Sequence, residues 1–221
     1  MLGLLLVGAE GGAREILPVY LTAALLLVAL VIATRGLHLD GLMDVCDGLF
    51  GGYSAERRLE IMRDSHVGAF AVVGVTSLLI LKYGSLVSLL SFRAPGKEWA
   101  LLLFPMFSRW SMVVLLGAFP YVRVQGLGSP FHQGGAKVAT FLAALTATAI
   151  SAVLGGFGGL GLLVGLSLVA WLLGLGMSRM LGGLTGDTYG AANEIIEVVG
   201  LMAAVALLTQ GWLGPLWQLI G

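Results

Sequence analysis

The chain has 221 residues, of which 58% are hydrophobic and 11% are charged, and its mean hydropathy is +0.98. A soluble domain carries about 25% charged residues, so this composition indicates a multi-pass protein of the lipid bilayer. The formal net charge is zero, which argues against nucleic acid as a partner. The single cysteine, Cys46, excludes an intramolecular disulfide and argues against a zinc site.

Six apolar stretches predict transmembrane helices, because one crossing takes about 20 helical residues. They cover residues 16–34, 67–90, 99–119, 138–154, 159–181 and 195–209. Lys82 interrupts the second stretch and is expected to mark its interfacial end. We therefore expect one domain over residues 1–221, an all-α polytopic membrane bundle of about six helices, with residues 1–9 as a candidate seventh. The oligomeric state stays open, a homo-oligomer included.

Charge concentrates directly after the first stretch, where Asp40, Asp44 and Asp47 follow one another at spacings of i, i+4 and i+7. In a helix these positions return to nearly the same angle and form one stripe. Three like charges on one face repel each other unless a positive group lies among them. A hard divalent cation such as Mg²⁺ accepts oxygen ligands and can also hold phosphates. The stripe therefore predicts a Mg²⁺ site.

The segment that follows, residues 56–64, is of mixed charge. Its apolar positions form a narrow stripe, which suits a helix lying along a membrane surface. Arg57, Arg58 and Arg63 would then face an aqueous or phosphate-bearing partner. The alternative is a solvated loop whose charges only keep the segment in water. The helical order of the preceding acids favours the functional interpretation.

The alternation of six spans places the loops 35–66, 120–137 and 182–194 on one side of the membrane. These loops and their edges hold most of the Lys and Arg residues, Arg123 among them. By the positive-inside rule, this side is expected to be the cytoplasmic face of the cell (inner) membrane. The two polar, glycine-rich segments then share one compartment.

The second polar segment carries Asp187, Asn193 and Glu194, and Glu197 follows inside the sixth apolar stretch. If a helix extends through this region, these side chains project on roughly one side of it. The alternative for the start of the segment is a helix cap at Thr185.

Two charges lie at membrane depth: Arg109 near the middle of the third stretch and Glu197 within the sixth. Charges there are costly, so function is the default interpretation. A phosphate-binding Arg109 and a structural Arg109–Glu197 pair both stay open. His38, two residues before Asp40, is a candidate proton acceptor, although a lone histidine is more often a packing or capping residue.

Acids and arginines around a membrane-embedded pocket suggest chemistry on a phosphorylated, partly apolar substrate. Carboxylates would hold Mg²⁺ on a diphosphate, arginines would neutralise developing charge, and one acid or histidine would deprotonate an alcohol. By this reasoning alone, the chain is a metal-dependent phosphotransferase of the membrane.

Two long motifs resemble the signatures of the adenosylcobinamide-GDP ribazoletransferase, or cobalamin synthase, family. The first comprises LHLDGL at residues 37–42, Asp44, DGL at 47–49, ERRLEIMRDS at 56–65 and GAF at 68–70. The second is LTGDTYGAANE at residues 184–194, and Arg109-Trp110 and residues 121–128 also look like family positions. The motifs follow in the family's order, and the resemblance covers nearly the whole chain.

The resemblance implies the last step of nucleotide-loop assembly in adenosylcobalamin synthesis. A hydroxyl of α-ribazole, or of its 5′-phosphate, attacks the phosphorus nearest the cobinamide of adenosylcobinamide-GDP, and GMP leaves, with Mg²⁺ as the expected metal. We expect catalytic roles at Asp40, Asp44, Asp47 and His38, and metal ligation by the three aspartates together with Asp187. Substrate binding is expected at Arg57, Arg58, Arg63, Arg109, Arg123, Asn193, Glu194 and Glu197.

Two other classes of protein stay open. A membrane phosphotransferase acting on a lipid head group would use the same acids and metal, but would release no GMP from the corrinoid substrate. A multi-pass transporter would also place ionisable residues at depth. It would be expected to show repeats or broken helices in paired halves, and the sequence shows no internal repeat.

Overall fold

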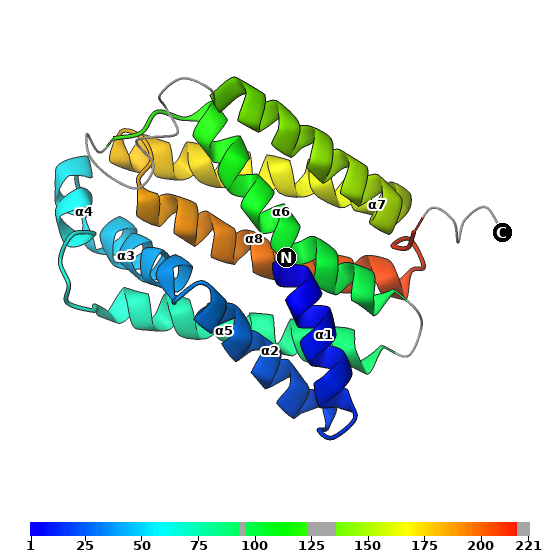
Figure 1. Cartoon of the computed structure of the whole chain (residues 1–221). Helices are drawn as coiled ribbons and strands as arrows, with labels where there is room; N and C mark the ends of the chain where they lie inside the picture. Colours follow the sequence, from blue (N-terminus) through cyan, green and yellow to red (C-terminus); the bar gives the residue numbers. More distant parts are fainter. Residues whose placement is uncertain (93–95, 123–135, 216–221) are drawn as a thin grey trace.

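The computed structural model describes residues 1–92, 96–122 and 136–215, and helices dominate it (Figure 1). In chain order they are α1 (Leu2–Arg14), α2 (Val19–Ala33), α3 (Leu37–Gly51), α4 (Ala55–Ile61), α5 (Ala69–Ser91), α6 (Lys97–Ala118), α7 (Ala136–Leu181) and α8 (Gly186–Thr209). The described residues form no β-strand beyond an isolated bridge between Tyr121 and Leu184. The predicted all-α class is confirmed.

Four helices, α5 to α8, are long and apolar enough to cross a membrane. The longest, α7, is broken at Gly156, whose φ of 57° and ψ of −143° are not helical. A Cβ on Gly159 would lie 2.4 Å from the carbonyl oxygen of Ser151. Residues eight apart in a straight helix are separated by about 12 Å, so the chain folds back here. The two halves of α7 correspond to the fourth and fifth predicted spans (Figure 1).

The first predicted span differs from the structure, because α2 has only 15 residues and is about 22 Å long. A bilayer core is about 30 Å thick. Taken together, α2 and α3 are long and apolar enough to cross a membrane, but their axes are bent by 85° relative to each other. Arg35 and Gly36, with φ values of 54° and 70°, make this bend. The first crossing is therefore a broken helix pair, which adds one span to those of α5 to α8 if the two bent helices are taken together.

α8 lies at the centre of the bundle, where it contacts α3, α5, α6 and α7. Within its most apolar window 61% of the residues are buried, compared with 22% for α5, which lies at the periphery. α2, α5 and α7 expose large apolar side chains such as Val28, Ile80 and Phe141. A lipid-facing surface of this kind is expected in a membrane bundle, whose backbone polar groups are satisfied inside each helix.

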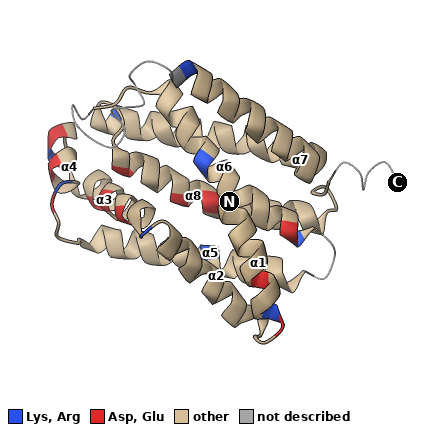
Figure 2. Ribbon diagram, in the orientation of Figure 1, with Lys and Arg blue, Asp and Glu red and all other residues tan. Residues whose placement is uncertain are grey.

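The polar loops gather at one end of the molecule. The backbone N–H of Val122, after α6, donates to the carbonyl oxygen of Leu184, after α7, with N and O 2.9 Å apart. Arg58 of α4 donates from Nη1 to the carbonyl oxygen of Met180 at 3.1 Å. The described parts of the loops 35–66, 120–137 and 182–194 thus lie together as expected, and residues 123–135 of the second loop lie outside the described residues. Figure 2 shows acidic residues on α3 and α4 at this end and further charges inside the bundle on α6 and α8.

The expected interfacial end at Lys82 is wrong. α5 continues without interruption from Ala69 to Ser91, and Lys82 lies near its middle with 2% of its surface exposed. Lys82 is retained at this depth because it is paired with buried carboxylates, described below.

Candidate active site

The predicted site residues fall into two groups. The first surrounds a polar cavity of about 270 Å³ where α3 meets the segment between α4 and α5. The second is a cluster of charged side chains buried between α5, α6 and α8. We call them the acidic cavity and the buried charge cluster; the residues of each are named below.

Asp40, Asp44 and Asp47 line one wall of the acidic cavity, and residues 62–67 with Ala71 line the other. α3 is helical through all three aspartates, so their spacing brings the carboxylates to one side, as the sequence predicts. Arg63, a predicted phosphate ligand, lines the same cavity. The cavity therefore combines acids with one arginine. This combination can hold a phosphate and accept a proton.

Asp47 is tied to the backbone at the start of α5. Its Oδ2 accepts a hydrogen bond from the backbone N–H of Gly68 at 2.6 Å, and its Oδ1 accepts one from Ala71 at 2.8 Å. The first N–H groups of a helix have no partner within the helix, and a carboxylate there also favours the helix dipole. Asp47 therefore caps α5 from another helix, a role that the sequence analysis did not assign to it.

Asp64 and His66 form an ion pair at the rim of the acidic cavity, with His66 Nδ1 and Asp64 Oδ1 2.5 Å apart. Both lie in the connection between α4 and α5. The hydrogen bond to Asp64 raises the pKa of His66, and the hydrogen bond from His66 lowers the pKa of Asp64. Sequence reasoning assigned no role to either residue, although both belong to or follow the first motif.

The two sequence motifs pack directly against each other through α3 and the first turns of α8. A Cβ on Gly41 would lie 2.8 Å from the carbonyl oxygen of Asp187, and one on Gly190 would lie 3.2 Å from the Cα of His38. Glycine at both positions therefore allows the close approach of the two helices. Thr185 caps α8 by accepting from the backbone N–H of Thr188, which confirms the capping alternative for the start of this motif.

A Mg²⁺ ion is compatible with part of the predicted ligand set. Among the described residues, no group of three or more His, Cys, Asp or Glu side chains is arranged to hold a metal ion. Asp47 already accepts two backbone N–H groups, and Asp187 does not line the acidic cavity. Mg²⁺ is commonly bound by one or two carboxylates together with water and substrate phosphates. Asp40 and Asp44 fit that arrangement, whereas a four-aspartate site does not fit.

The buried charge cluster consists of Lys82, Arg109, Glu194, Glu197 and the hydroxyl of Ser108. Lys82 Nζ donates to Glu194 Oε2 at 2.5 Å and to Glu197 Oε2 at 2.7 Å. Glu197 Oε1 accepts from Arg109 and, at 3.3 Å, from Ser108 Oγ. The cluster joins three helices with two positive and two negative groups. The structural Arg109–Glu197 pair is thus present as a contact, and phosphate binding by Arg109 stays a prediction.

Two further predicted site residues, His38 and Asn193, contact each other: Asn193 Nδ2 lies 3.0 Å from His38 Nδ1. Asn193 is fully buried, and its Oδ1 accepts no hydrogen bond from the described residues. His38 does not line the acidic cavity. The contact therefore links α3 to α8 near the charge cluster. The packing alternative for His38 has direct support, and its role as a proton acceptor stays a prediction.

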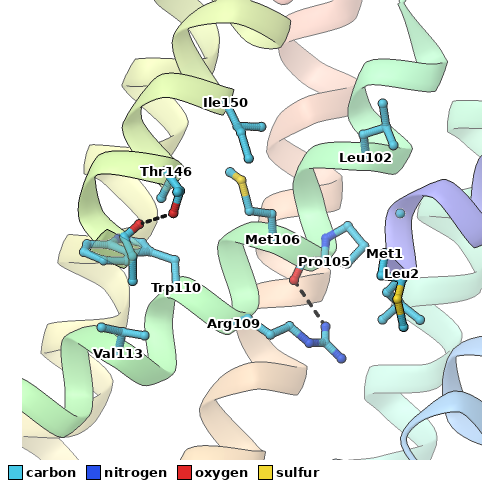
Figure 3. A pocket seen from close by; sticks show the side chains of 13 residues that line it. Met1, Leu2, Leu102, Pro105, Met106, Arg109, Trp110, Val113, Thr146 and Ile150 are labelled. Carbon is cyan, nitrogen blue, oxygen red and sulfur yellow. Dashed lines mark hydrogen bonds between the residues drawn. The ribbon is translucent and has the colours of Figure 1, made fainter. Parts of the chain in front are cut away.

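Arg109 reaches a second cavity, of about 390 Å³, that lies between α1, α6 and the first half of α7. Figure 3 shows its side chain pointing from α6 toward Met1 and Leu2, with Met106 and Ile150 across the cavity. The lining is mostly apolar, so the guanidinium group is its main polar feature. None of the residues of the acidic cavity lines this second one.

Three further arginines were expected to bind substrate. Arg57 is exposed and pairs with Glu60, its Nη1 lying 2.6 Å from Oε2. Arg58 donates to the end of α7, as described above, so it contributes to the fold. Arg123 lies outside the described residues. Substrate binding by each of them stays a prediction.

A family model described as cobalamin-5-phosphate synthase matches residues 1–205. An adenosylcobinamide-GDP ribazoletransferase of Desulfitobacterium hafniense is 40% identical over 219 residues, covering 94% of this chain and 84% of the relative. Enzymes of the same name from Desulforamulus reducens and Geotalea daltonii are 42% and 40% identical, covering 77% and 93% of this chain and 68% and 82% of theirs. No solved structure matches the chain.

Proposed function

The chain belongs to the cobalamin-5-phosphate synthase family, a family of membrane transferases in nucleotide-loop assembly, and we propose that it joins adenosylcobinamide-GDP to α-ribazole or α-ribazole 5′-phosphate. The products are adenosylcobalamin, or its 5′-phosphate, and GMP. The observation that carries the proposal is the acidic cavity, which three carboxylates of the first motif line together with Arg63. A cavity of this composition suits a diphosphate and an attacking alcohol better than an apolar solute.

In the proposed reaction, the ribazole hydroxyl oxygen forms a bond to the phosphorus nearest the cobinamide. The bond from that phosphorus to the bridging oxygen breaks, and its electron pair leaves with GMP. Asp40 and Asp44 accept the hydroxyl proton in this proposal because both line the acidic cavity, whereas Asp47 caps α5 and His38 does not line the cavity. Arg63 neutralises the charge that develops on the phosphate oxygens.

Asp40 and Asp44 would also hold Mg²⁺. When bound, the ion would polarise the phosphoryl oxygens as a Lewis acid. Asp187 is a weaker candidate ligand, because it does not line the acidic cavity.

We also propose that the acidic cavity opens to the cytoplasm from the inner membrane. The polar loops gather at one end of the bundle, and this end carries Arg57, Arg58 and Arg63. By the positive-inside rule, such an end stays on the cytoplasmic side. A nucleotide-linked, water-soluble substrate would reach the cavity from there.

The test is incubation of the purified protein in lipid nanodiscs with adenosylcobinamide-GDP, α-ribazole and Mg²⁺. The expected result is equal amounts of the complete corrinoid and GMP, and no product without Mg²⁺. Parallel reactions with α-ribazole 5′-phosphate compare the two acceptors by kcat/KM. Absence of GMP, or GMP release without a joined corrinoid, would contradict the proposal. Transfer to a lipid in place of ribazole would favour the head-group alternative.

A further inference from the structure

The two carboxylate oxygens of Glu197 are divided between two cations. Oε1 accepts from Arg109 Nη1 and from Ser108, while Oε2 accepts from Lys82 Nζ at 2.7 Å. Lys82 is held in place by a second carboxylate, that of Glu194. Both oxygens of Glu197 are therefore engaged, each by a different helix.

This division determines how Arg109 can bind. An arginine facing a carboxylate commonly forms two parallel N–H···O bonds, one to each oxygen. Here Lys82 already donates to the second oxygen, so a bidentate Arg109 would have to share Oε2 with the ammonium group. Every hydrogen bond that Arg109 makes to the described residues comes from Nη1. The Nε and Nη2 edge of the guanidinium group is left for another acceptor. The side chain of Arg109 is 31% exposed and borders the cavity of about 390 Å³ (Figure 3).

We propose that Lys82 is a positioning residue: by holding Glu197 Oε2, it keeps Arg109 singly paired. The outer edge of the guanidinium group is then left for a substrate phosphate oxygen that enters the cavity of about 390 Å³, outside the acidic cavity. This inference rests on the proposed function for the identity of the phosphate. It adds a residue to which neither the motifs nor the acidic cavity assigned a role. Lys82 acts through Glu197 and Arg109 and does not itself touch the substrate.

Stability alone does not account for the cluster. The four charged groups sum to zero, and their burial requires desolvation that their mutual attraction repays only in part. Replacing a buried ion pair by apolar groups of similar size is often neutral for stability or increases it. An arrangement in which the described residues bond only Nη1 of the arginine is better explained by a ligand at its other edge.

The experiment removes Lys82 without leaving an unpaired buried charge. The double variant Lys82→Met, Glu194→Gln loses one cation and one anion, and retains Arg109 and Glu197. We expect it to fold with a Tm close to that of the wild type, and its Arg109 to turn so that two nitrogens bind the two oxygens of Glu197. Loss of a hydrogen bond to a charged group corresponds to about a ten- to hundredfold rise in KM for adenosylcobinamide-GDP, with KM for α-ribazole unchanged.

Two comparisons isolate the effect. The single variant Glu194→Gln serves as the reference, because it keeps Lys82 on Glu197, and the ratio between double and single variant measures the contribution of Lys82. The matched control is Lys97→Met, Glu10→Gln, which removes an ion pair of 2.7 Å that joins α6 to α1. That pair touches neither the acidic cavity nor the buried charge cluster, so this control should keep both KM values.

A double variant that keeps the KM of its reference, or whose structure shows Arg109 still singly paired, would overturn the inference. The structural measurement is independent of turnover. If the wild type releases no GMP, the proposed function fails, while the geometry of Arg109 in the double variant still decides the role of Lys82. An anionic lipid carries the same phosphate oxygens, so kinetics are compared in discs with and without phosphatidylglycerol. A KM difference found only with phosphatidylglycerol would assign the edge to lipid and overturn the substrate assignment.

Discussion

The carboxylate of Asp47 accepts a hydrogen bond of 2.6 Å from the backbone N–H of Gly68, which is the N-cap residue of α5. A third acid of the first motif thus fixes the helix that follows it. Its partners in the acid stripe line the cavity from earlier positions on α3: Asp44 lies about one turn before Asp47, and Asp40 about two turns before it. The three carboxylates share a face, yet their environments predict different consequences when each is removed.

We expect Asp40→Asn and Asp44→Asn to lower kcat by about a hundredfold or more, because they remove catalytic charge from the acidic cavity. Asp47→Asn should also lower Tm, since an amide oxygen can replace only one of its two accepted bonds; the loss is about 1 kcal/mol, typical of a helix cap. Thermal unfolding in detergent measures Tm, and the rate of GMP release measures kcat. Wild-type turnover by an Asp40→Asn, Asp47→Asn double variant would refute the role of the stripe.

Gly41→Ala should separate α3 from α8. The added Cβ would lie 2.8 Å from the carbonyl oxygen of Asp187, a backbone atom that cannot turn aside. Overpacking of this kind costs about 1–3 kcal/mol and should lower both Tm and kcat/KM. The control on the same helix is Gly51→Ala, where the Cβ meets only Ile61 Cδ1 at 3.5 Å. Equal effects of the two substitutions would contradict the close packing of the two motifs.

Glu197→Gln should destabilise the protein more than Arg109→Met does. Loss of the Glu197 charge leaves the cations Lys82 and Arg109 with only one buried anion, whereas loss of Arg109 leaves Lys82 with both carboxylates. An uncompensated buried charge costs about 3–5 kcal/mol. Thermal unfolding of the two single variants shows which of them is less stable. The double variant Arg109→Met, Glu197→Gln is measured beside them. The reverse order would mean that Glu197 is not the shared anion of the cluster.

The pair of Asp64 and His66 should make the rim of the acidic cavity sensitive to pH. The pKa of His66 is raised above 6.5 by its hydrogen bond to Asp64, so its contribution is complete below pH 6.5 and is lost as the pH rises through the raised value. The pKa of Asp64 is lowered below 3.8 by His66, and its contribution is lost as the pH falls through that lowered value. An NMR titration of the His66 ring should show the raised pKa. Asp64→Asn should return it toward 6.5, and an unchanged titration would exclude the pair in solution.

Cysteine labelling tests whether the two motifs face one compartment. In a Cys46→Ser background, we choose Tyr53→Cys after α3, where the side chain is 98% exposed, and Gly186→Cys at the start of α8, where an added Cβ meets nothing within 4 Å. Tyr189 is unsuitable because it is buried. A membrane-impermeant maleimide should label both positions from the cytoplasmic side of inverted vesicles. Labelling from opposite sides would exclude a shared site.

The sequence predicted those features that depend on spacing along one helix. The acid stripe of α3, the cap at Thr185 and the return of the polar loops to one end all follow from helical periodicity and the alternation of spans. The all-α class follows from hydropathy. The chain reversal in the middle of α7 also matches a predicted boundary, since the fourth and fifth stretches were separated at the glycine-rich turn.

The contacts that depend on which helices become neighbours could not be predicted. Lys82 was interpreted as an interfacial residue because hydropathy reports only that a charge interrupts an apolar stretch. Its partners lie 112 and 115 residues away, on a helix whose neighbours no periodicity specifies. The cap that Asp47 provides for α5 was missed for the same reason, because a carboxylate at helical spacing carries no sign of a backbone partner 21 residues further along.

The pairing of Lys82 with Glu194 and Glu197 has a consequence for biogenesis. When the ribosome has delivered α5 to the translocon, both carboxylates are still unsynthesised, since they follow more than a hundred residues later. A lysine at the centre of an inserting helix costs about 2.5–3.5 kcal/mol, which the leucine and valine residues of α5 must offset during insertion. α5 thus enters the bilayer on its apolar residues alone and acquires its counter-ions when α8 arrives.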